Sequence, residues 1–287
     1  MKAFHTFHVP KNENFLFHDF EIFTMTLSAL EWRKLNGNIC IVTDTLGKDY
    51  LCALGLLSAS TKSPKESIWD EYSLALDGMD ALCIDESVFW AGCKLYALQQ
   101  FQEPCVMMDL DFIVWETMDF SKFGNHIAVI HREEVNNSVY PDKDFFAFRN
   151  GYRFDANLDW DIAACNTAFA YFGDIDFMQV YARKALEFMQ YAVPNHDGLP
   201  YMVTAEQRFL AMYAMIYGKC IYSLSALDEL FLEHQTKFTH IWGDKAVLRR
   251  NEEMSKKFCS DCAKRICHDF PEWAKRLKNQ YWFTKYM

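Results

Sequence analysis

Glycine, proline and long apolar runs are all scarce in this chain of 287 residues. With 11 glycines and 7 prolines, the chain shows no long flexible linker. No stretch reaches the roughly 18 apolar residues of a membrane span, and the N-terminus lacks the uninterrupted apolar run of a signal peptide. We therefore expect a cytoplasmic protein whose ten cysteines are free thiols.

Positive charge is also scarce. The 29 Lys and Arg residues against 39 Asp and Glu residues give a formal net charge of -10. The chain therefore lacks the basic face that sequence-independent nucleic-acid binding needs, and we expect no nucleic-acid partner. Aromatic residues are abundant at 16%, within a 51% apolar composition, which predicts a bulky core. The length suits one large α/β domain or two small ones.

Strand-like and helical patterns alternate along the chain. Strand patterns cover KAFHTF, residues 38–43, the segment from Cys105, HIAVIHRE and NTAFAYFGD. Helical patterns cover residues 19–35, ESVFWAGCKLYALQQF after a capping Asp85, residues 177–192, a helix opened by a capping box at residues 204–207, and the tail from residue 252. This order predicts a mostly parallel sheet with helices on both faces.

Two carboxylates, Asp109 and Asp111, interrupt the apolar segment EPCVMMDLDFIVWE where the expected central strand ends. Side chains at i and i+2 share one side of a strand, so both carboxylates can reach one point, where they repel each other. Mn²⁺ or Mg²⁺ removes this repulsion and prefers carboxylate and phosphate oxygens. We interpret the pair as a cation site for a diphosphate. In the alternative, one Asp caps a turn and the other is solvated.

A second group of polar residues lies in THIWGDK, which contains His240, Gly243 and Lys245. Histidine can add a nitrogen ligand to Mn²⁺, glycine lets the backbone approach a phosphate, and lysine provides a point charge for phosphate oxygens. Taken alone, His240 is better explained as a hydrogen-bonded core or surface residue. Its combination with the Asp pair favours a cation and phosphate site.

These motifs resemble those of nucleotide-sugar glycosyltransferases of the GT-A fold, in particular the glycogenin-like and bacterial lipopolysaccharide galactosyltransferase-like branch. In that branch, Asp-x-Asp holds Mn²⁺ or Mg²⁺ on the donor diphosphate, and a late His-x-x-Gly-x-x-Lys-Pro-Trp motif adds a third ligand and a lysine. His240 and Gly243 match, whereas Lys245 stands one residue early and Ala246-Val247 replace Pro-Trp. The resemblance implies that His240 and the Asp pair are the metal ligands.

Further fragments resemble the same family. CNTAFAYFGD resembles its Asn-Ser/Thr-Gly strand, with Ala168 in place of glycine; TAEQRFL resembles its Asp-Gln segment; FWAGCKLYALQQF resembles the helix before Asp-x-Asp; and IVTD resembles an early strand end near the nucleotide. The implied donor or acceptor contacts are Thr43, Asp44, Lys94, Asn166, Thr167, Gly243 and Lys245, and the implied catalytic residues are Asp109, Asp111, Glu206 and Gln207. By topology, Thr6 and His5 of the first strand also lie near the nucleotide. Two alternatives stay open, in which Lys94 snorkels from a helix and Asp44 caps a turn.

The resemblance spans roughly residues 3–250 in ordered fragments. It implies a single GT-A-like α/β domain over residues 1–287, with a Rossmann-like mixed, mostly parallel sheet flanked by helices. Residues 1–115 would form a nucleotide-binding half, 116–250 an acceptor and metal half, and 251–287 a helical tail. The implied activity is Mn²⁺- or Mg²⁺-dependent hexosyl transfer from a nucleoside diphosphate sugar, such as a UDP-sugar, to a glycan or glycolipid acceptor, as in bacterial surface polysaccharide synthesis.

Two other classes of protein compete with this interpretation. A haloacid dehalogenase-type phosphatase also uses Asp-x-Asp, and GDIDF imitates its later acidic motif, but its first motif lies near the N-terminus and does not continue with Phe112-Ile113. The other competitor is a catalytically inactive, transferase-like protein that only binds a partner or polysaccharide. The intact Asp pair and His240 argue against it.

The C-terminal region raises two smaller questions. Cys259, Cys262, Cys267 and His268 are residue types that bind zinc, but one helix cannot wrap four ligands around an ion, so we expect ordinary thiols. The basic and aromatic tail AKRLKNQYWFTKYM can contact the inner face of a membrane or an acceptor lipid. We expect it to pack on the domain instead.

Overall fold

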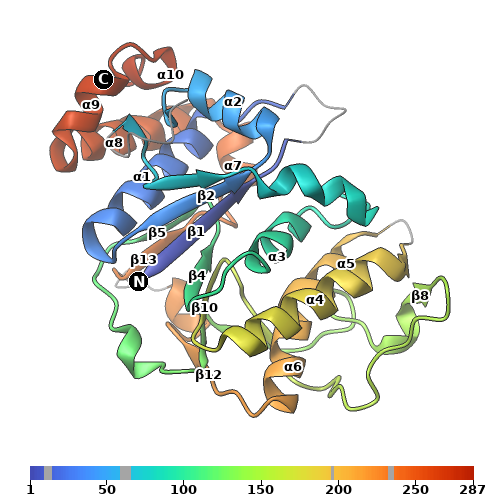
Figure 1. Cartoon of the computed structure of the whole chain (residues 1–287). Helices are drawn as coiled ribbons and strands as arrows, with labels where there is room; N and C mark the ends of the chain where they lie inside the picture. The colour runs from blue at the N-terminus through green and yellow to red at the C-terminus, as the bar shows by residue number, and fades with distance from the viewer. Residues whose placement is uncertain (10–14, 59–65, 195–196, 232–235) are drawn as a thin grey trace. The chain divides into compact units, whose positions relative to one another are not determined.

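The computed structural model describes residues 1–9, 15–58, 66–194, 197–231 and 236–287 (Figure 1). The chain divides into two units made of interleaved segments. Unit 1 comprises Met1, Ala75–Met108 and Asp119–Gln235, and unit 2 comprises Lys2–Leu74, Asp109–Met118 and Thr236–Met287. Asp109, Asp111 and His240 therefore belong to the same unit although they are far apart in the sequence.

Unit 2 contains three parallel strands in the order β1-β2-β3, namely β1 (Lys2–Phe7), β2 (Ile39–Thr43) and β3 (Glu71–Ser73). In register, Phe4 pairs with Cys40 and Ile41 pairs with Tyr72. Every residue of β2 is buried. Such a continuous buried run is typical of a parallel strand that is covered on both faces.

A short antiparallel pair in unit 2 joins β5 (Phe112–Val114) to β13 (Phe238–His240), which lie side by side in Figure 1. Phe112 pairs with His240, and Val114 pairs with Phe238. The rings of Phe112 and Phe238 stack with their centroids 5.0 Å apart. This pairing brings residue 240 to the position next to Asp111.

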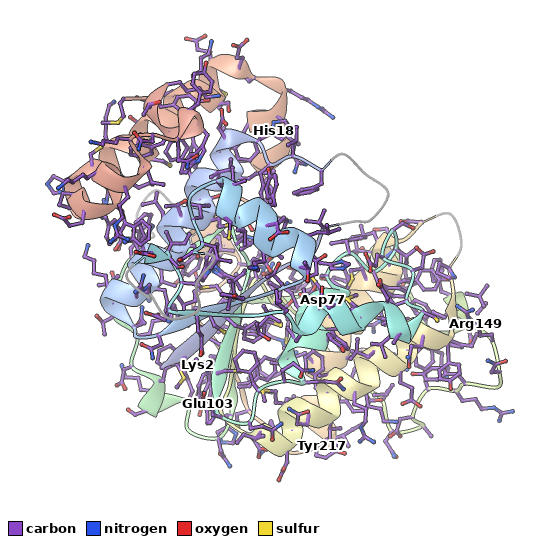
Figure 2. All side chains as sticks on the ribbon, turned by 45° about the horizontal axis from the view of Figure 1, so that its top comes forward. Lys2, His18, Asp77, Glu103, Arg149 and Tyr217 are labelled. Carbon is purple, nitrogen blue, oxygen red and sulfur yellow. The ribbon has the colours of Figure 1, made fainter. Side chains whose placement is uncertain are left out.

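The helices of unit 2 are α1 (Asp19–Leu35), α2 (Thr45–Ala53), α7 (Lys245–Arg250), α8 (Glu252–Asp269), α9 (Pro271–Leu277) and α10 (Tyr281–Thr284). Helix α1 begins after His18, which is labelled in Figure 2, and has acidic residues in its first turn and basic residues in its last turn, as the helix dipole favours. It packs against β5 and α8.

Unit 1 contains four strands in the order β12-β6-β10-β4, namely β12 (Ile221–Ser223), β6 (Ile127–Val129), β10 (Phe169–Phe172) and β4 (Cys105–Met108). β12 runs parallel to β6, whereas β10 is antiparallel to both β6 and β4. Two short antiparallel pairs join β7 (Arg132–Glu133) to β9 (Ala164–Cys165) and β8 (Ala147–Phe148) to β11 (Ala192–Val193).

The helices of unit 1 are α3 (Gly92–Leu98), α4 (Ile175–Tyr191), α5 (Leu199–Val203) and α6 (Phe209–Ile216), and a π-helical turn, Thr204–Arg208, connects the last two. Short 3₁₀ helices cover Ala75–Leu82, Phe120–Lys122, Lys143–Phe145 and Asp228–Phe231. Helix α4 packs against α3 and α6. The exposed side chains of Arg149 and Tyr217 lie at the periphery of this unit (Figure 2).

The seven strands and their flanking helices confirm the predicted mixed α/β class. Two local predictions were wrong. The helix expected after Asp85 is limited to Gly92–Leu98, because Asp85 caps an isolated turn through the Ser87 N–H (3.1 Å) instead. Thr204 caps no helix, because the helical stretch begins five residues earlier at Leu199, with Pro200 in its first turn.

The C-terminal helices pack on unit 2 as expected. The rings of Trp282 and Phe283 lie 5.1 and 5.9 Å from the ring of Phe23 in α1. Cys259, Cys262 and Cys267 all lie on α8, and the ten cysteines are free thiols. Among the described residues, no helix combines the length and apolar character needed to cross a membrane.

Candidate metal centre

The Asp pair lies in a turn between β4 and β5. β4 ends at Met108, and the Phe112 N–H donates a hydrogen bond to the Asp109 carbonyl oxygen at 3.1 Å, which closes the turn Asp109–Phe112. The sequence predicts that both carboxylates meet because they alternate along a strand. In the structure, the turn brings them together instead.

His240 completes a group of three possible metal ligands. One ligand atom from each of Asp109, Asp111 and His240 lies within 4.8 Å of the other two. His240 Nε2 is 3.7 Å from Asp111 Oδ2. The histidine reaches this position because its strand pairs with β5, which begins directly after Asp111. The structure thus places the three predicted ligands at one point.

The second carboxylate of the group is nearly inaccessible to water. Asp111 is 6% exposed, and its Oδ2 atom accepts no hydrogen bond from the described residues. The Lys245 ammonium lies 2.8 Å from this oxygen as an ion pair that lacks hydrogen-bond geometry. A buried carboxylate oxygen without a donor is costly unless a cation compensates it, and here the Lys245 ammonium is that cation. Two carboxylates and an imidazole are also ligands that suit Mn²⁺ or Mg²⁺, and such an ion would take the place of the ammonium beside Asp111.

The loop around Gly243 is open. Gly243 is exposed, and an added Cβ atom would meet no other atom within 4 Å, so packing within the protein does not require glycine there. Trp242 is 58% exposed and stacks on the His240 ring at 6.3 Å. Lys245 is the first residue of α7 and keeps 34% of its side chain exposed. The loop that follows His240 is therefore exposed, whereas the His240 side chain itself is only 12% exposed.

The predicted nucleotide contacts Thr6, Thr43 and Asp44 lie at the carboxyl ends of β1 and β2. Thr43 donates its hydroxyl proton to the Phe7 carbonyl oxygen at 2.6 Å. Asp44 Oδ1 caps α2 by accepting the Gly47 N–H at 2.8 Å, so the turn-capping alternative for Asp44 holds for this oxygen. All three residues are buried.

His5, expected near the nucleotide, is completely buried in β1. Burial lowers the pKa of its imidazole to about 3, although the negative charge of Asp109 acts in the opposite direction. The ring is therefore neutral at pH 7. A neutral imidazole without solvent contact is a hydrogen-bonding group of the core rather than a ligand-binding charge.

Lys94 and Glu206, two predicted site residues, form a buried ion pair in unit 1. Only 9% and 7% of their side chains are exposed. The Tyr181 hydroxyl donates a hydrogen bond to the Glu206 carbonyl oxygen at 2.6 Å and so ties α4 to the π-helical turn. Lys94 therefore points into the unit and does not snorkel toward water, which removes that alternative.

Asn166 and Gln207 belong to a polar cluster that the sequence did not reveal, centred on Glu133. The carboxylate contacts His131 Nε2 at 3.0 Å, the Tyr140 hydroxyl at 2.7 Å and Asn166 Nδ2 at 3.2 Å. These hydrogen bonds, that of His131 first, lower the pKa of Glu133 to about 2. The Tyr140 hydroxyl also lies 2.6 Å from Gln207 Oε1. Thr167, the neighbour of Asn166, is 1% exposed.

The cluster was missed because its members share no spacing rule. The segment HREE overlaps the end of the expected strand HIAVIHRE, but it is the two-residue pairing of β7 with β9 that places Glu133 opposite Ala164 and near Asn166. Strands this short leave no periodic pattern. A polar pair directly after a buried strand is the one signal that could have pointed to it.

The turn before β5 supplies two carboxylates, and β13, the partner strand of β5, supplies an imidazole. These three groups define this chain as a protein with a candidate divalent-metal centre. The chain belongs to the Family of unknown function (DUF6734), whose model matches residues 1–280. None of the curated proteins matches its sequence.

Among the solved structures that are similar to this chain are the following three. Mouse xyloside xylosyltransferase 1, in its apo form, shares 12% identity with a TM-score of 0.42 over 78% of this chain and 85% of the other. The glycosyltransferase GlyE of Streptococcus pneumoniae TIGR4 shares 9% identity with a TM-score of 0.33, over 78% and 45%. The apo structure of the bifunctional enzyme WbbM shares 13% identity with a TM-score of 0.36, over 77% and 38%. TM-scores this low do not bear on the activity of this chain.

Proposed function

We propose that this protein is a Mn²⁺- or Mg²⁺-dependent glycosyltransferase that uses a nucleoside diphosphate sugar, such as a UDP-sugar, as donor. The observation that carries the proposal is the group formed by Asp109, Asp111 and His240, with a buried Asp111 oxygen that accepts no hydrogen bond from the described residues. Metal sites of this composition keep room for substrate phosphates.

In this proposal, some residues of the chain bind the cation and others contact the diphosphate directly. Asp109, Asp111 and His240 hold the cation, which when bound stabilises the negative charge that develops on the leaving diphosphate. Lys245, now 2.8 Å from Asp111, is close enough to turn its flexible ammonium toward the phosphates. Gly243 leaves space for their approach.

The remaining predicted residues would contact the nucleotide, the transferred sugar and the acceptor. We assign the nucleotide to Thr6, Thr43 and Asp44, and we assign the sugar and acceptor to Lys94, Asn166, Thr167, Glu206 and Gln207. Glu133 joins the second group. Because its pKa lies near 2, Glu133 is ionised at neutral pH and accepts hydrogen bonds from hydroxyl groups rather than acting as an acid.

A thermal-shift screen of nucleoside diphosphate sugars with and without Mn²⁺ tests the proposal, because a ligand that binds the folded state raises the unfolding midpoint. We expect one donor to raise the midpoint only when Mn²⁺ is present. Asp111→Asn should lose this shift, whereas Asp49→Asn, a change at an exposed aspartate of the same unit, should keep it.

Release of nucleoside diphosphate upon sugar transfer would then establish the reaction. Hydrolysis of phosphate monoesters without a nucleotide-sugar response would instead favour the phosphatase alternative. If no nucleotide binds in the presence of Mn²⁺, the transferase assignment is wrong and the inactive, partner-binding alternative gains support.

For the acceptor, we propose a glycan or a glycolipid, reached by peripheral contact with the cytoplasmic face of a membrane. Lys275, Arg276 and Lys278 of the tail are exposed, and Tyr281 is 76% exposed. Basic side chains beside an amphipathic ring suit an anionic lipid surface. Sedimentation with vesicles should show binding that requires anionic lipid and weakens with salt. Equal binding to neutral vesicles would contradict this electrostatic contact.

A further inference from the structure

A completely buried series of hydrogen bonds ends at the turn that contains the Asp pair. Trp69 Nε1 donates to His5 Nδ1 at 3.1 Å, and His5 Nε2 lies 3.1 Å from Ser28 Oγ. Ser28 in turn donates its hydroxyl proton to the Phe112 carbonyl oxygen. All four side chains are inaccessible to solvent. The series therefore connects β1 and α1 to the first residue of β5.

The direction of every hydrogen bond in this series is fixed by its two ends. An indole N–H can only donate, so His5 Nδ1 must accept and the imidazole proton must be on Nε2. At the other end, a carbonyl oxygen can only accept, so the single hydroxyl proton of Ser28 points to Phe112. The Ser28 oxygen is then the acceptor for His5 Nε2–H.

Phe112 connects the turn that contains the two aspartates to the strand that contains His240. Its N–H closes the turn on Asp109, it directly follows Asp111, and it pairs in register with His240. Its carbonyl oxygen is held by Ser28 from α1. A hydrogen bond that fixes Phe112 thus restrains all three ligands at once.

We propose that Trp69, His5 and Ser28 are positioning residues that hold the turn Asp109–Phe112 in the shape that binds the cation. The inference rests on the proposed function only in assuming that a divalent cation binds to Asp109 and its two partners. Hydrogen bonds made directly to metal-binding side chains typically change metal affinity by about 10–100-fold when they are removed. The Ser28 hydrogen bond acts on the neighbouring residue Phe112, so we expect an effect at the lower end of that range.

The Mn²⁺ affinity of the full chain, measured by electron paramagnetic resonance, tests the proposal. Ser28→Ala removes the hydrogen bond to Phe112 and should weaken Mn²⁺ binding about tenfold. Thr26→Val is the matched control, because Thr26 is equally buried on α1 but donates to the Ile22 carbonyl oxygen of its own helix at 2.7 Å. It should bind Mn²⁺ like the wild type. Equal affinities in the two variants would overturn the proposal.

Trp69→Phe tests the direction of the series. The substitution keeps an aromatic ring in the core but removes the indole N–H that donates to His5 Nδ1. We expect the nitrogen chemical shifts of His5 to show the Nε2–H form in the wild type and a mixture of both neutral forms in the variant, together with weaker Mn²⁺ binding. Unchanged shifts would contradict the assigned direction. Ser28→Thr, which keeps the hydroxyl, should retain more affinity than Ser28→Ala.

A separate measurement distinguishes failure of this proposal from failure of the proposed function. If the wild type binds no Mn²⁺, the cation site itself is wrong. Amide hydrogen exchange then decides on the positioning role alone. The Phe112 N–H should exchange faster in Ser28→Ala and at the wild-type rate in Thr26→Val, and equal rates in both would show that Ser28 does not restrain the turn.

Discussion

Lys245 stands close to the place that a cation would occupy beside Asp111. Its ammonium compensates a buried carboxylate, so cation binding must displace it. We therefore predict that Lys245→Met strengthens Mn²⁺ binding in the absence of donor, by roughly threefold to tenfold, since an ion pair of this exposure contributes up to about 1 kcal/mol. The same variant should lose transfer activity because the diphosphate loses a point charge.

Calorimetric titration with Mn²⁺, followed by a transfer assay, separates these two effects. Lys256→Met, at a largely exposed lysine on α8, is the control and should change neither quantity. Weaker Mn²⁺ binding in Lys245→Met would show that the lysine supports the ion instead of competing with it.

Glu133 predicts a pH dependence of stability. Its pKa is lowered to about 2 in the folded protein from an ordinary value of 4.5, so the unfolded chain binds the proton more readily. The stabilisation is complete above about pH 4.5 and is lost as the pH falls toward 2. The difference in unfolding free energy between wild type and Glu133→Gln should shrink by about 1 to 3 kcal/mol from pH 7 to pH 3. Urea titrations measure it, and a constant difference would refute the assignment.

The residue types, together with the resemblance to family motifs, were enough to predict that Asp109, Asp111 and His240 lie together, but not what surrounds them. Asp109, Asp111 and His240 stand out because charged and ligating residues are unusual in apolar segments. Ser28 and Trp69 do not stand out, because serine in a helix and tryptophan near a strand are ordinary core residues. Their contribution depends on tertiary contacts, which no local pattern encodes.

At the scale of elements, the ion pair of Lys94 and Glu206 links α3 to the π-helical turn. Removal of one partner leaves an uncompensated buried charge, so Lys94→Met or Glu206→Gln should each lower the unfolding free energy by about 3 to 5 kcal/mol. The double variant should recover a large part of this loss. Urea unfolding of the four proteins forms the cycle, and additive effects would mean that the two charges do not interact.

Long elements followed their sequence patterns, whereas short ones did not. The structure has α1 at Asp19–Leu35 as predicted, and α4 differs from its predicted range by only a few residues. Helix α3 is shorter than its apolar pattern, because residues 86–91 form turns. Thr204 satisfied the pattern of a capping box, but the buried run before it was helical too. The periodicity of apolar residues along the sequence reflects which side chains are buried. It reveals where a helix begins or ends only if the helix has an exposed face and a buried face.

At the scale of the whole molecule, the last helix, α10, packs against the first helix, α1. Phe283 of α10 is completely buried and contacts Phe23 of α1. Phe283→Ala should therefore cost about 3 to 5 kcal/mol of unfolding free energy, as large-to-small changes in cores do. Tyr281→Ala, at a side chain 76% exposed in the same helix, should cost less than about 1 kcal/mol. Denaturant unfolding measures the loss of unfolding free energy in each variant. Similar losses in the two variants would contradict the difference in burial between Phe283 and Tyr281.

The antiparallel partnership of Phe112 and His240 also bears on how the protein is made. During synthesis both aspartates leave the ribosome long before the strand that contains His240, so a partly made chain has two of the three ligands. A divalent ion would consequently stabilise only the completed and folded chain. A one-residue slip in the register of that strand would turn the imidazole to the opposite face of the strand and abolish this stabilisation.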